Sequence, residues 1–139
     1  QQSLELRNPA STRPWQHVLE PLSAYLRLAE CLWQSPSLAG AYNFGPDSAG
    51  ARSVGEVIGL AHAAFGYGEW HCPEQASGPH EAGQLALEVA LAKQVLGVRP
   101  RWSVAEAVAR SMHWHRDFGQ GADARTLCAS DLAAYEASP

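Results

Sequence analysis

The sequence predicts an α+β domain in which capped helices are joined by short extended segments. Two capping boxes, Ser53–Glu56 and Ser103–Glu106, each open a run of apolar residues at three- and four-residue spacing. A third such run covers Leu22–Trp33 and stops at a Ser-Pro-Ser turn. With 139 residues, the chain has the length of one domain.

Weaker patterns predict the other elements. We expect the first capped helix to stop at Gly66 and the second near Phe118. A further helix is predicted at Ala90–Leu96, and a short one is expected to start at Ser130. Alternating or β-rich residues predict four strands, Leu4–Leu6, Ala41–Phe44, Tyr67–Cys72 and Leu85–Val89.

The stretch that organises the chain is an elbow around Arg13. Because Pro14 follows it, Arg13 is pushed into an extended conformation. We expect the extended segment to continue to Glu20, and Pro21 to be the first residue of the next helix. A rigidly held arginine in such an elbow is suited to meet an anion, although it could equally be an exposed charge at a strand end.

Composition excludes several classes of function. The formal net charge is −4 and the arginines are scattered, which argues against a nucleic-acid partner. No apolar run approaches the ~20 residues that span a bilayer. Cys31, Cys72 and Cys128 are widely spaced, as expected for reduced thiols in the cytoplasm. The first residues do not form a signal peptide, and since they lack Met we expect a piece of a longer protein.

The elbow, Arg-Pro-Trp-Gln-His-Val-Leu-Glu-Pro-Leu from Arg13 to Leu22, resembles a motif in the C-terminal part of CDP-glucose 4,6-dehydratases. These are extended short-chain dehydrogenase/reductase enzymes that use NAD on a nucleotide sugar. Three further stretches follow the order and spacing of this family, namely Tyr42–Pro46, Pro79–Ala82 and Lys93–Trp102. The resemblance runs from about Leu6 to Tyr135.

The resemblance implies a substrate-binding lobe with one helix and strand, residues 21–45, that belong against the Rossmann sheet of a cofactor domain. Arg13 would bind the diphosphate of the nucleotide sugar, with His80 and Glu81 as further candidates for substrate binding. Gly78 stands where related epimerases carry a second phosphate-binding arginine. His80 and Glu81 are also compatible with a loop-to-strand ion pair.

The catalytic and cofactor motifs of this family are missing from the sequence. A dinucleotide needs a glycine-rich turn between a strand and a helix, and no such turn is present. The family's Tyr-x-x-x-Lys pair is also lacking, because Val89 stands four residues before Lys93, the only lysine. We therefore predict no catalytic residue and no bound NAD in this chain, the Rossmann core being absent.

The sequence also gives no reason to expect a metal. Its nearest clusters are His71-Cys72 and the pair His113 and His115. Adjacent residues of a strand point apart, and residues two apart on a helix diverge, so neither cluster brings ligands together.

The function implied is the substrate-binding portion of a nucleotide-sugar 4,6-dehydratase, inactive alone. In the intact enzyme, NAD would take hydride from C4 of CDP-glucose, water would leave across C5–C6, and hydride would return at C6. We expect CDP-glucose to bind the isolated chain weakly. Self-association, or contact with the missing cofactor domain, is expected through the apolar face of residues 22–33. The alternatives are a stand-alone non-enzymatic module that binds a nucleotide sugar or a partner chain, and a remnant without a ligand.

Overall fold

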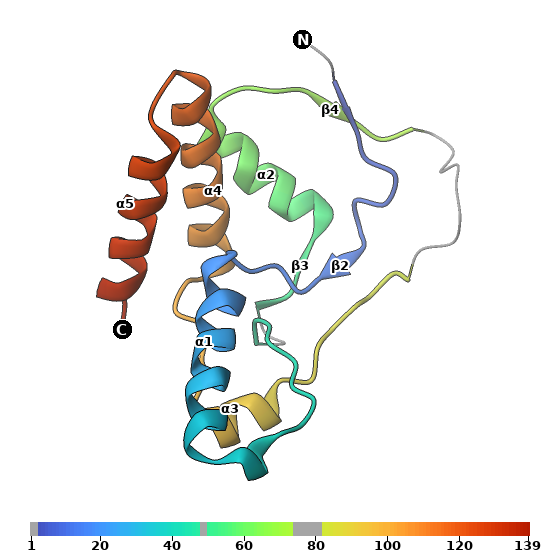
Figure 1. Ribbon diagram of the computed structural model, residues 1–139. Coiled ribbons are helices and arrows are strands. Elements are labelled where there is room, and N and C mark those ends of the chain that lie inside the picture. The colour runs from blue at the N-terminus through green and yellow to red at the C-terminus, as the bar shows by residue number, and fades with distance from the viewer. Residues whose placement is uncertain (1–2, 48–49, 74–81) are drawn as a thin grey trace.

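The computed structural model describes residues 3–47, 50–73 and 82–139 (Figure 1). These residues form five α-helices, α1 (Leu19–Gln34), α2 (Val54–Phe65), α3 (Ala90–Leu96), α4 (Val104–Gly119) and α5 (Ala124–Ala137), and one 3-10 turn, Pro36–Leu38. They also form four two-residue strands, β1 (Leu4–Glu5), β2 (Thr12–Arg13), β3 (Arg52–Ser53) and β4 (Trp70–His71). The described chain is thus mainly helical with few strand residues, a mixed composition that agrees with the α+β class.

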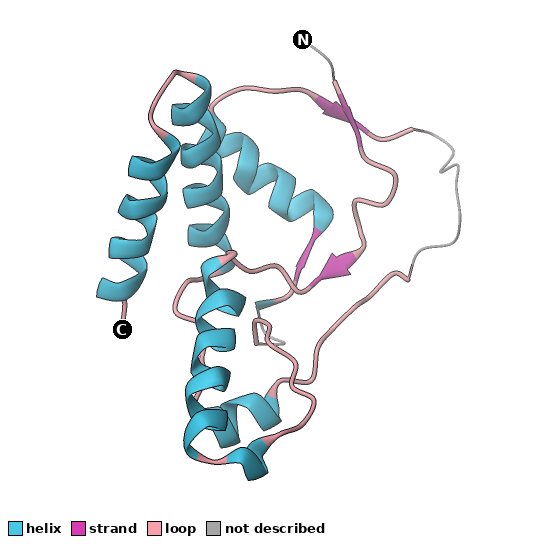
Figure 2. Ribbon diagram, viewed as in Figure 1, coloured by secondary structure: helices cyan, strands magenta, loops and turns pink. Residues whose placement is uncertain are grey.

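The helices gather in two groups. In the first, α4 packs against both α2 and α5, and in the second α1 packs against α3 (Figure 1). Arg27 connects the two helices of the second group: its Nε, on α1, donates to the carbonyl of Leu96, on α3, at 3.2 Å. Long loops and the four strands lie to one side of the helices (Figure 2). The site described below lies among these strands.

The strands form two separate pairs. β1 runs parallel to β4, with Leu4 opposite Trp70, and β2 runs antiparallel to β3, with Arg13 opposite Arg52. The first pair confirms the strands predicted near residues 4–6 and 67–72, although both are shorter than expected. The β3 strand was not predicted.

Two predicted strands are wrong, since residues 41–44 and 85–89 are loops in the structure. In this region, side-chain amides donate hydrogen bonds to backbone carbonyls. Asn43 Nδ2 donates to the carbonyl of Glu88 at 3.1 Å, and Gln16 Nε2 donates to that of Phe44 at 3.1 Å. Next to residues 85–89, Thr12 and Gln84 form only an isolated β-bridge. Short apolar runs of this kind become strands only where a partner strand meets them.

The helices with local signals agree closely with prediction. Ser53 and Glu56 form both halves of a capping box on α2, and Gly66 ends that helix at φ 94°. Ser103 Oγ accepts from the Glu106 N–H at the start of α4. α3 has the predicted bounds. Its N-cap, Val89, makes no side-chain capping bond, but Glu88 Oε1 accepts from the Ala90 N–H at 2.7 Å.

Two helix starts differ from prediction. α1 begins at Leu19, so Pro21 is its third residue and the extended segment does not reach Glu20. Pro21 fits there because N–H groups of the first turn have no intrahelical acceptor. α5 begins at Ala124 and not at Ser130, since Asp123 Oδ2 accepts from the Thr126 N–H at 2.8 Å and so caps the helix earlier.

One part of the core surrounds Trp102, which is 6% exposed. Its ring meets His17 and Tyr135 edge-on, with ring centroids 4.8 and 5.1 Å away. Glu20 is buried beside it. One carboxylate oxygen, Oε1, accepts from the N–H groups of Arg101 and Trp102, and the other accepts from the Tyr135 hydroxyl at 2.8 Å. This carboxylate joins α1 to the start of α4 and the end of α5.

The apolar residues of α1 lie mostly on its exposed face. The buried positions of this helix include Ala24 and Cys31, whereas Leu26 is 75% exposed and Trp33 is 90% exposed. The face toward α3 therefore carries small side chains, and the large ones point away from it. No helix among the described residues is both long and apolar enough to cross a membrane.

Candidate functional site

Arg13 is held between two neighbouring segments. On one edge, β2 pairs with β3. On the other edge, Thr12 donates to the carbonyl of Gly83 at 2.9 Å and accepts from the Leu85 N–H at 3.2 Å. Pro14 follows directly and keeps Arg13 extended, as predicted. Segments from three distant parts of the sequence thus fix this arginine at the elbow before α1.

The guanidinium of Arg13 reaches back along the second edge. Its Nη1 donates to the carbonyls of Thr12 at 2.8 Å and Ala82 at 3.0 Å. Ala82 is the residue that follows Glu81 in the sequence. His80 and Glu81 themselves lie outside the described residues, as does Gly78.

A second arginine, which the sequence analysis missed, stands opposite the first. Arg52 is the cross-strand partner of Arg13. Directly opposed residues of an antiparallel pair share one face, with Cβ atoms about 4.5–5.5 Å apart. Like charges in this arrangement repel each other. Consistent with that, Arg13 extends toward Ala82, whereas Arg52 Nη1 donates to the Ala51 carbonyl at 3.0 Å.

Arg52 has only a weak carboxylate partner. Its Nε lies 4.0 Å from the Glu56 carboxylate, and both side chains are about half exposed. Hydrogen bonds from the backbone and then the side chain of Ser53 lower the pKa of Glu56, which keeps this carboxylate ionised as the partner of the capping box. The Arg52 carbonyl accepts from Trp15 Nε1 at 3.0 Å and so ties β3 to the residues after Arg13. The backbone that carries the two arginines is therefore held by several hydrogen bonds. An anion could bridge their two guanidiniums.

The signal that could have identified Arg52 was indirect. The capping box at Ser53 was recognised, but the residue before it had no strand pattern of its own. Its pairing with Arg13 depends on β2, which lies far upstream, so only the folded backbone brings the two arginines together.

The glycine turns of the described residues do not fit a dinucleotide cofactor. Such a cofactor places its pyrophosphate at a glycine-rich turn between a strand and a helix N-terminus. Here β3 runs directly into α2, with Ser53 serving as strand end and cap. Gly66 and Gly97 have positive φ, but both stand at helix C-termini. No step of NAD chemistry is therefore assigned to these residues.

Other chemistries find little support in the part of the chain that the structure describes. No group of three or more His, Cys, Asp or Glu side chains in residues 3–47, 50–73 and 82–139 could hold a metal ion. Lys93 forms an ion pair with Asp47. The arrangement at Arg13 and Arg52 is suited to binding an anion.

Comparison with known proteins agrees with the sequence resemblance. The chain is 33% identical over 135 residues to the CDP-glucose 4,6-dehydratase of Salmonella typhimurium, a match that covers 96% of this chain and 38% of that enzyme. The chain thus spans less than half the length of this relative. No protein-family model matches it.

Solved structures show the same fold. A UDP-glucose 4-epimerase from Stenotrophomonas maltophila, with bound NAD and formylated UDP-arabinopyranose, aligns with a TM-score of 0.73 over 86% of this chain and 37% of its own, at 17% identity. A UDP-galactose 4-epimerase aligns with a TM-score of 0.62 over 85% of this chain and 35% of its own, at 18% identity. This chain therefore shares its fold with part of each of these two structures. The predicted resemblance to a CDP-glucose 4,6-dehydratase is confirmed, and it extends over nearly the whole of this chain.

Proposed function

We propose that this chain is the nucleotide-sugar-binding part of a CDP-glucose 4,6-dehydratase, in which Arg13 and Arg52 grip the diphosphate of the substrate. The observation that carries this proposal is the cross-strand pair itself, in which Arg13 of β2 stands directly opposite Arg52 of β3. A diphosphate between them would replace repulsion by two charge-assisted contacts. Arg52 would thereby serve as the second phosphate-binding arginine, a role that Gly78 cannot fill because it has no side chain.

The intact enzyme would act in the cytoplasm and would use NAD, held by residues other than those described. Support for this step comes from the similarity to the Salmonella dehydratase and from an epimerase of the same fold that holds NAD. This chain would contribute binding and orientation of the substrate. Alone it would not dehydrate CDP-glucose.

The exposed face of α1 would be covered by the cofactor domain of that longer enzyme. Leu22, Tyr25, Leu26 and Trp33 are between 47% and 90% exposed on this face. The relative is much longer than the matched stretch, which leaves ample chain to supply such a domain. When the chain is isolated, a second copy would take its place.

Titration with CDP-glucose, followed by amide NMR, tests the proposed site. A charge-assisted contact contributes ~1.5–3 kcal/mol, so two contacts fall short of the ~8 kcal/mol of micromolar binding, and we expect a weaker, saturable interaction. Shifts should centre on residues 12–13 and 52–54. Arg13→Ala and Arg52→Ala should each weaken binding by about tenfold or more.

Arg125→Ala is the matched control, because Arg125 is an exposed arginine on α5, away from the strands. It should leave the affinity for CDP-glucose unchanged. Binding that survives both changes at the elbow would show that the diphosphate site lies elsewhere. Dehydration of CDP-glucose by the isolated chain with added NAD would contradict the proposal that this chain only binds and orients the substrate.

A further inference from the structure

A second concentration of positive charge lies in a cavity far from the elbow. The cavity has a volume of about 370 Å³ and opens between α1, the segment joining α3 to α4, and the end of α5. Arg27, Arg99 and Arg101 all line it. Figure 1 places β2 and the C-terminal end of α5 on opposite sides of α1 and α4, so this cavity is separate from the site at Arg13.

Two of these arginines are held in place by contacts within the fold, Arg101 by groups without net charge and Arg27 partly by a carboxylate. Arg101 Nη1 donates to the Tyr135 carbonyl at 2.9 Å, and its guanidinium lies 4.9 Å from the centre of the Tyr135 ring. Arg27 Nε donates to the Leu96 carbonyl, while its Nη1 pairs with the exposed Glu30 at 2.7 Å. Both guanidiniums are thus positioned in advance, and that of Arg101 keeps its full charge.

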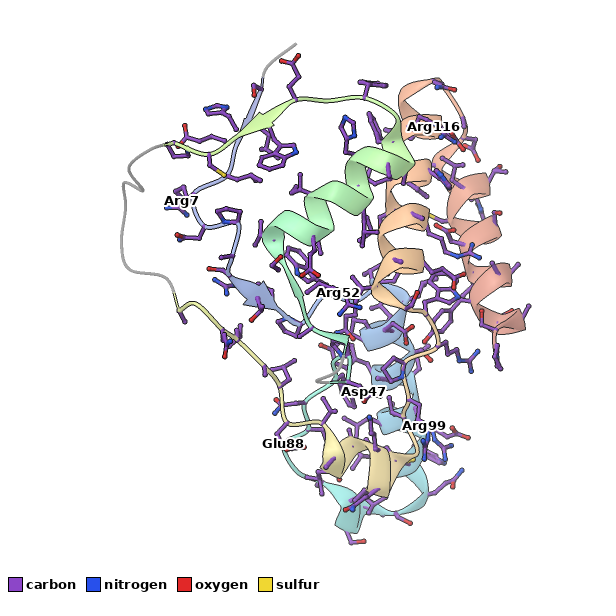
Figure 3. The ribbon with its side chains drawn as sticks, turned by 180° about the vertical axis from the view of Figure 1, so that it is seen from behind. Arg7, Asp47, Arg52, Glu88, Arg99 and Arg116 are labelled. Carbon is purple, nitrogen blue, oxygen red and sulfur yellow. The ribbon has the colours of Figure 1, made fainter. Side chains whose placement is uncertain are left out.

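Arg99 completes the cavity from the connecting segment. Gly97 turns the chain at φ 69°, and Pro100 favours an extended conformation of Arg99. Its side chain is exposed beside α1 (Figure 3). Among the described residues, no carboxylate lies within ion-pair distance, 4.0 Å, of Arg99 or Arg101.

The acidic residue in the cavity wall does not neutralise these charges at short range. Glu20 lines the cavity, but both of its carboxylate oxygens accept hydrogen bonds from Arg101 N–H, Trp102 N–H and the Tyr135 hydroxyl. Arg27 is paired with Glu30, whereas Arg99 and Arg101 line the cavity without a carboxylate at ion-pair distance among the described residues.

We propose that this cavity is a second anion site, which binds a phosphate group of at least two negative charges, such as inorganic pyrophosphate. Guanidinium forks match phosphate oxygens in pairs, and three of them on one wall favour a polyanion over a single carboxylate. The volume lies within the range of small-molecule sites, about 300–1,000 Å³. Ser23, which also lines the cavity, offers a hydroxyl to the same ligand.

The experiment is a titration of the 139-residue chain with inorganic pyrophosphate, followed by amide NMR, with orthophosphate in parallel. Saturable shifts are expected at residues 97–102 and around Arg27, with pyrophosphate bound more tightly than orthophosphate. Arg99→Gln is the first variant, because this exposed side chain has no hydrogen bond or ion pair to the described residues that it would lose. It should weaken pyrophosphate binding by about tenfold.

Two control variants separate a site from general charge attraction. Arg125→Gln removes an exposed arginine from α5, and Arg13→Gln removes the proposed diphosphate arginine of the elbow. Both should leave pyrophosphate shifts at residues 97–102 unchanged. The proposal is overturned if no saturation occurs below about 10 mM, a limit near the weakest specific affinities. It is equally overturned if Arg125→Gln weakens binding as much as Arg99→Gln, or if the shifts are confined to β2 and β3 and absent from residues 97–102.

Discussion

The hydroxyl of Tyr135 donates to the buried carboxylate of Glu20 at 2.8 Å, joining the end of α5 to the first turn of α1. This contact fixes the helix that follows the Arg13 elbow. The sequence did not reveal this contact, because Glu20 was expected at the end of an extended segment.

Removing the Tyr135 hydroxyl should destabilise the fold. Tyr135→Phe leaves one oxygen of the buried Glu20 carboxylate without its donor, which costs about 1–3 kcal/mol of unfolding free energy. Chemical denaturation followed by tryptophan fluorescence measures the change. Tyr25→Phe is the control, since Tyr25 is 57% exposed and should lose almost nothing. Equal stability of both variants would show that the Glu20 contact contributes little.

The same tyrosine should make stability depend on alkaline pH. Burial, followed by the hydrogen bond to Glu20, raises the pKa of Tyr135 from 10.0 to about 12. The folded state therefore binds this proton more tightly than the unfolded state. The resulting stability is present below pH 10 and is lost as the pH rises toward 12. Denaturation at several pH values should show a fall that is smaller in Tyr135→Phe.

His17 should give the opposite dependence at acidic pH. Burial is the main cause that lowers the pKa of His17 below 6.5, against the nearby charges of Asp131 and Glu20. Its Nδ1 accepts from the Leu19 N–H at 3.3 Å, so protonation also removes this acceptor. The contribution of neutral His17 is present above pH 6.5 and is lost as the pH falls through the lowered pKa.

Unfolding free energies between pH 5 and 7 test this dependence. His17→Asn keeps a side-chain acceptor near the Leu19 N–H but does not titrate in this range. It should therefore flatten the pH profile relative to the unchanged chain. A profile of the same slope in both proteins would assign the dependence to other groups.

The isolated chain should self-associate through the apolar face of α1. Covering a few hundred Å² of apolar surface at about 25 cal/mol per Å² gives on the order of 10 kcal/mol before the costs of association. Leu26→Asp should weaken association in sedimentation equilibrium. Leu132→Asp, at a 47% exposed leucine of α5, should have little effect. A monomer at high micromolar concentration would contradict the proposed role of this face.

Features with local causes could be predicted from the sequence. Ser53, Ser103 and Gly66 act within one helical turn, so the bounds of α2 and α4 were nearly correct. The prediction of a strand at residues 41–44 was wrong, because a strand requires a partner strand that sequence patterns do not reveal. The predicted start of α5 was wrong, because Asp123 was not recognised as the residue that caps this helix.

The candidate site shows the same division. Arg13 was recognised from its motif and its extended conformation followed from Pro14, both of which are local. Arg52 became visible only through the pairing of β2 with β3. His80 and Glu81 remain predictions, since they lie outside the described residues.

The pairing of β1 with β4 has a consequence for exchange with solvent. Only two residue pairs join these strands, held by bonds such as Leu4 N–H to the Glu69 carbonyl at 2.9 Å, yet they close a loop containing β2, α1, β3 and α2. Closing so long a loop is entropically costly for so short a ladder. The amides of Leu4 and Leu6 should therefore exchange with deuterium by local opening, well before those of α2 and α4. Each opening would also uncover the apolar cavity of about 560 Å³ that Leu4 and Trp70 line.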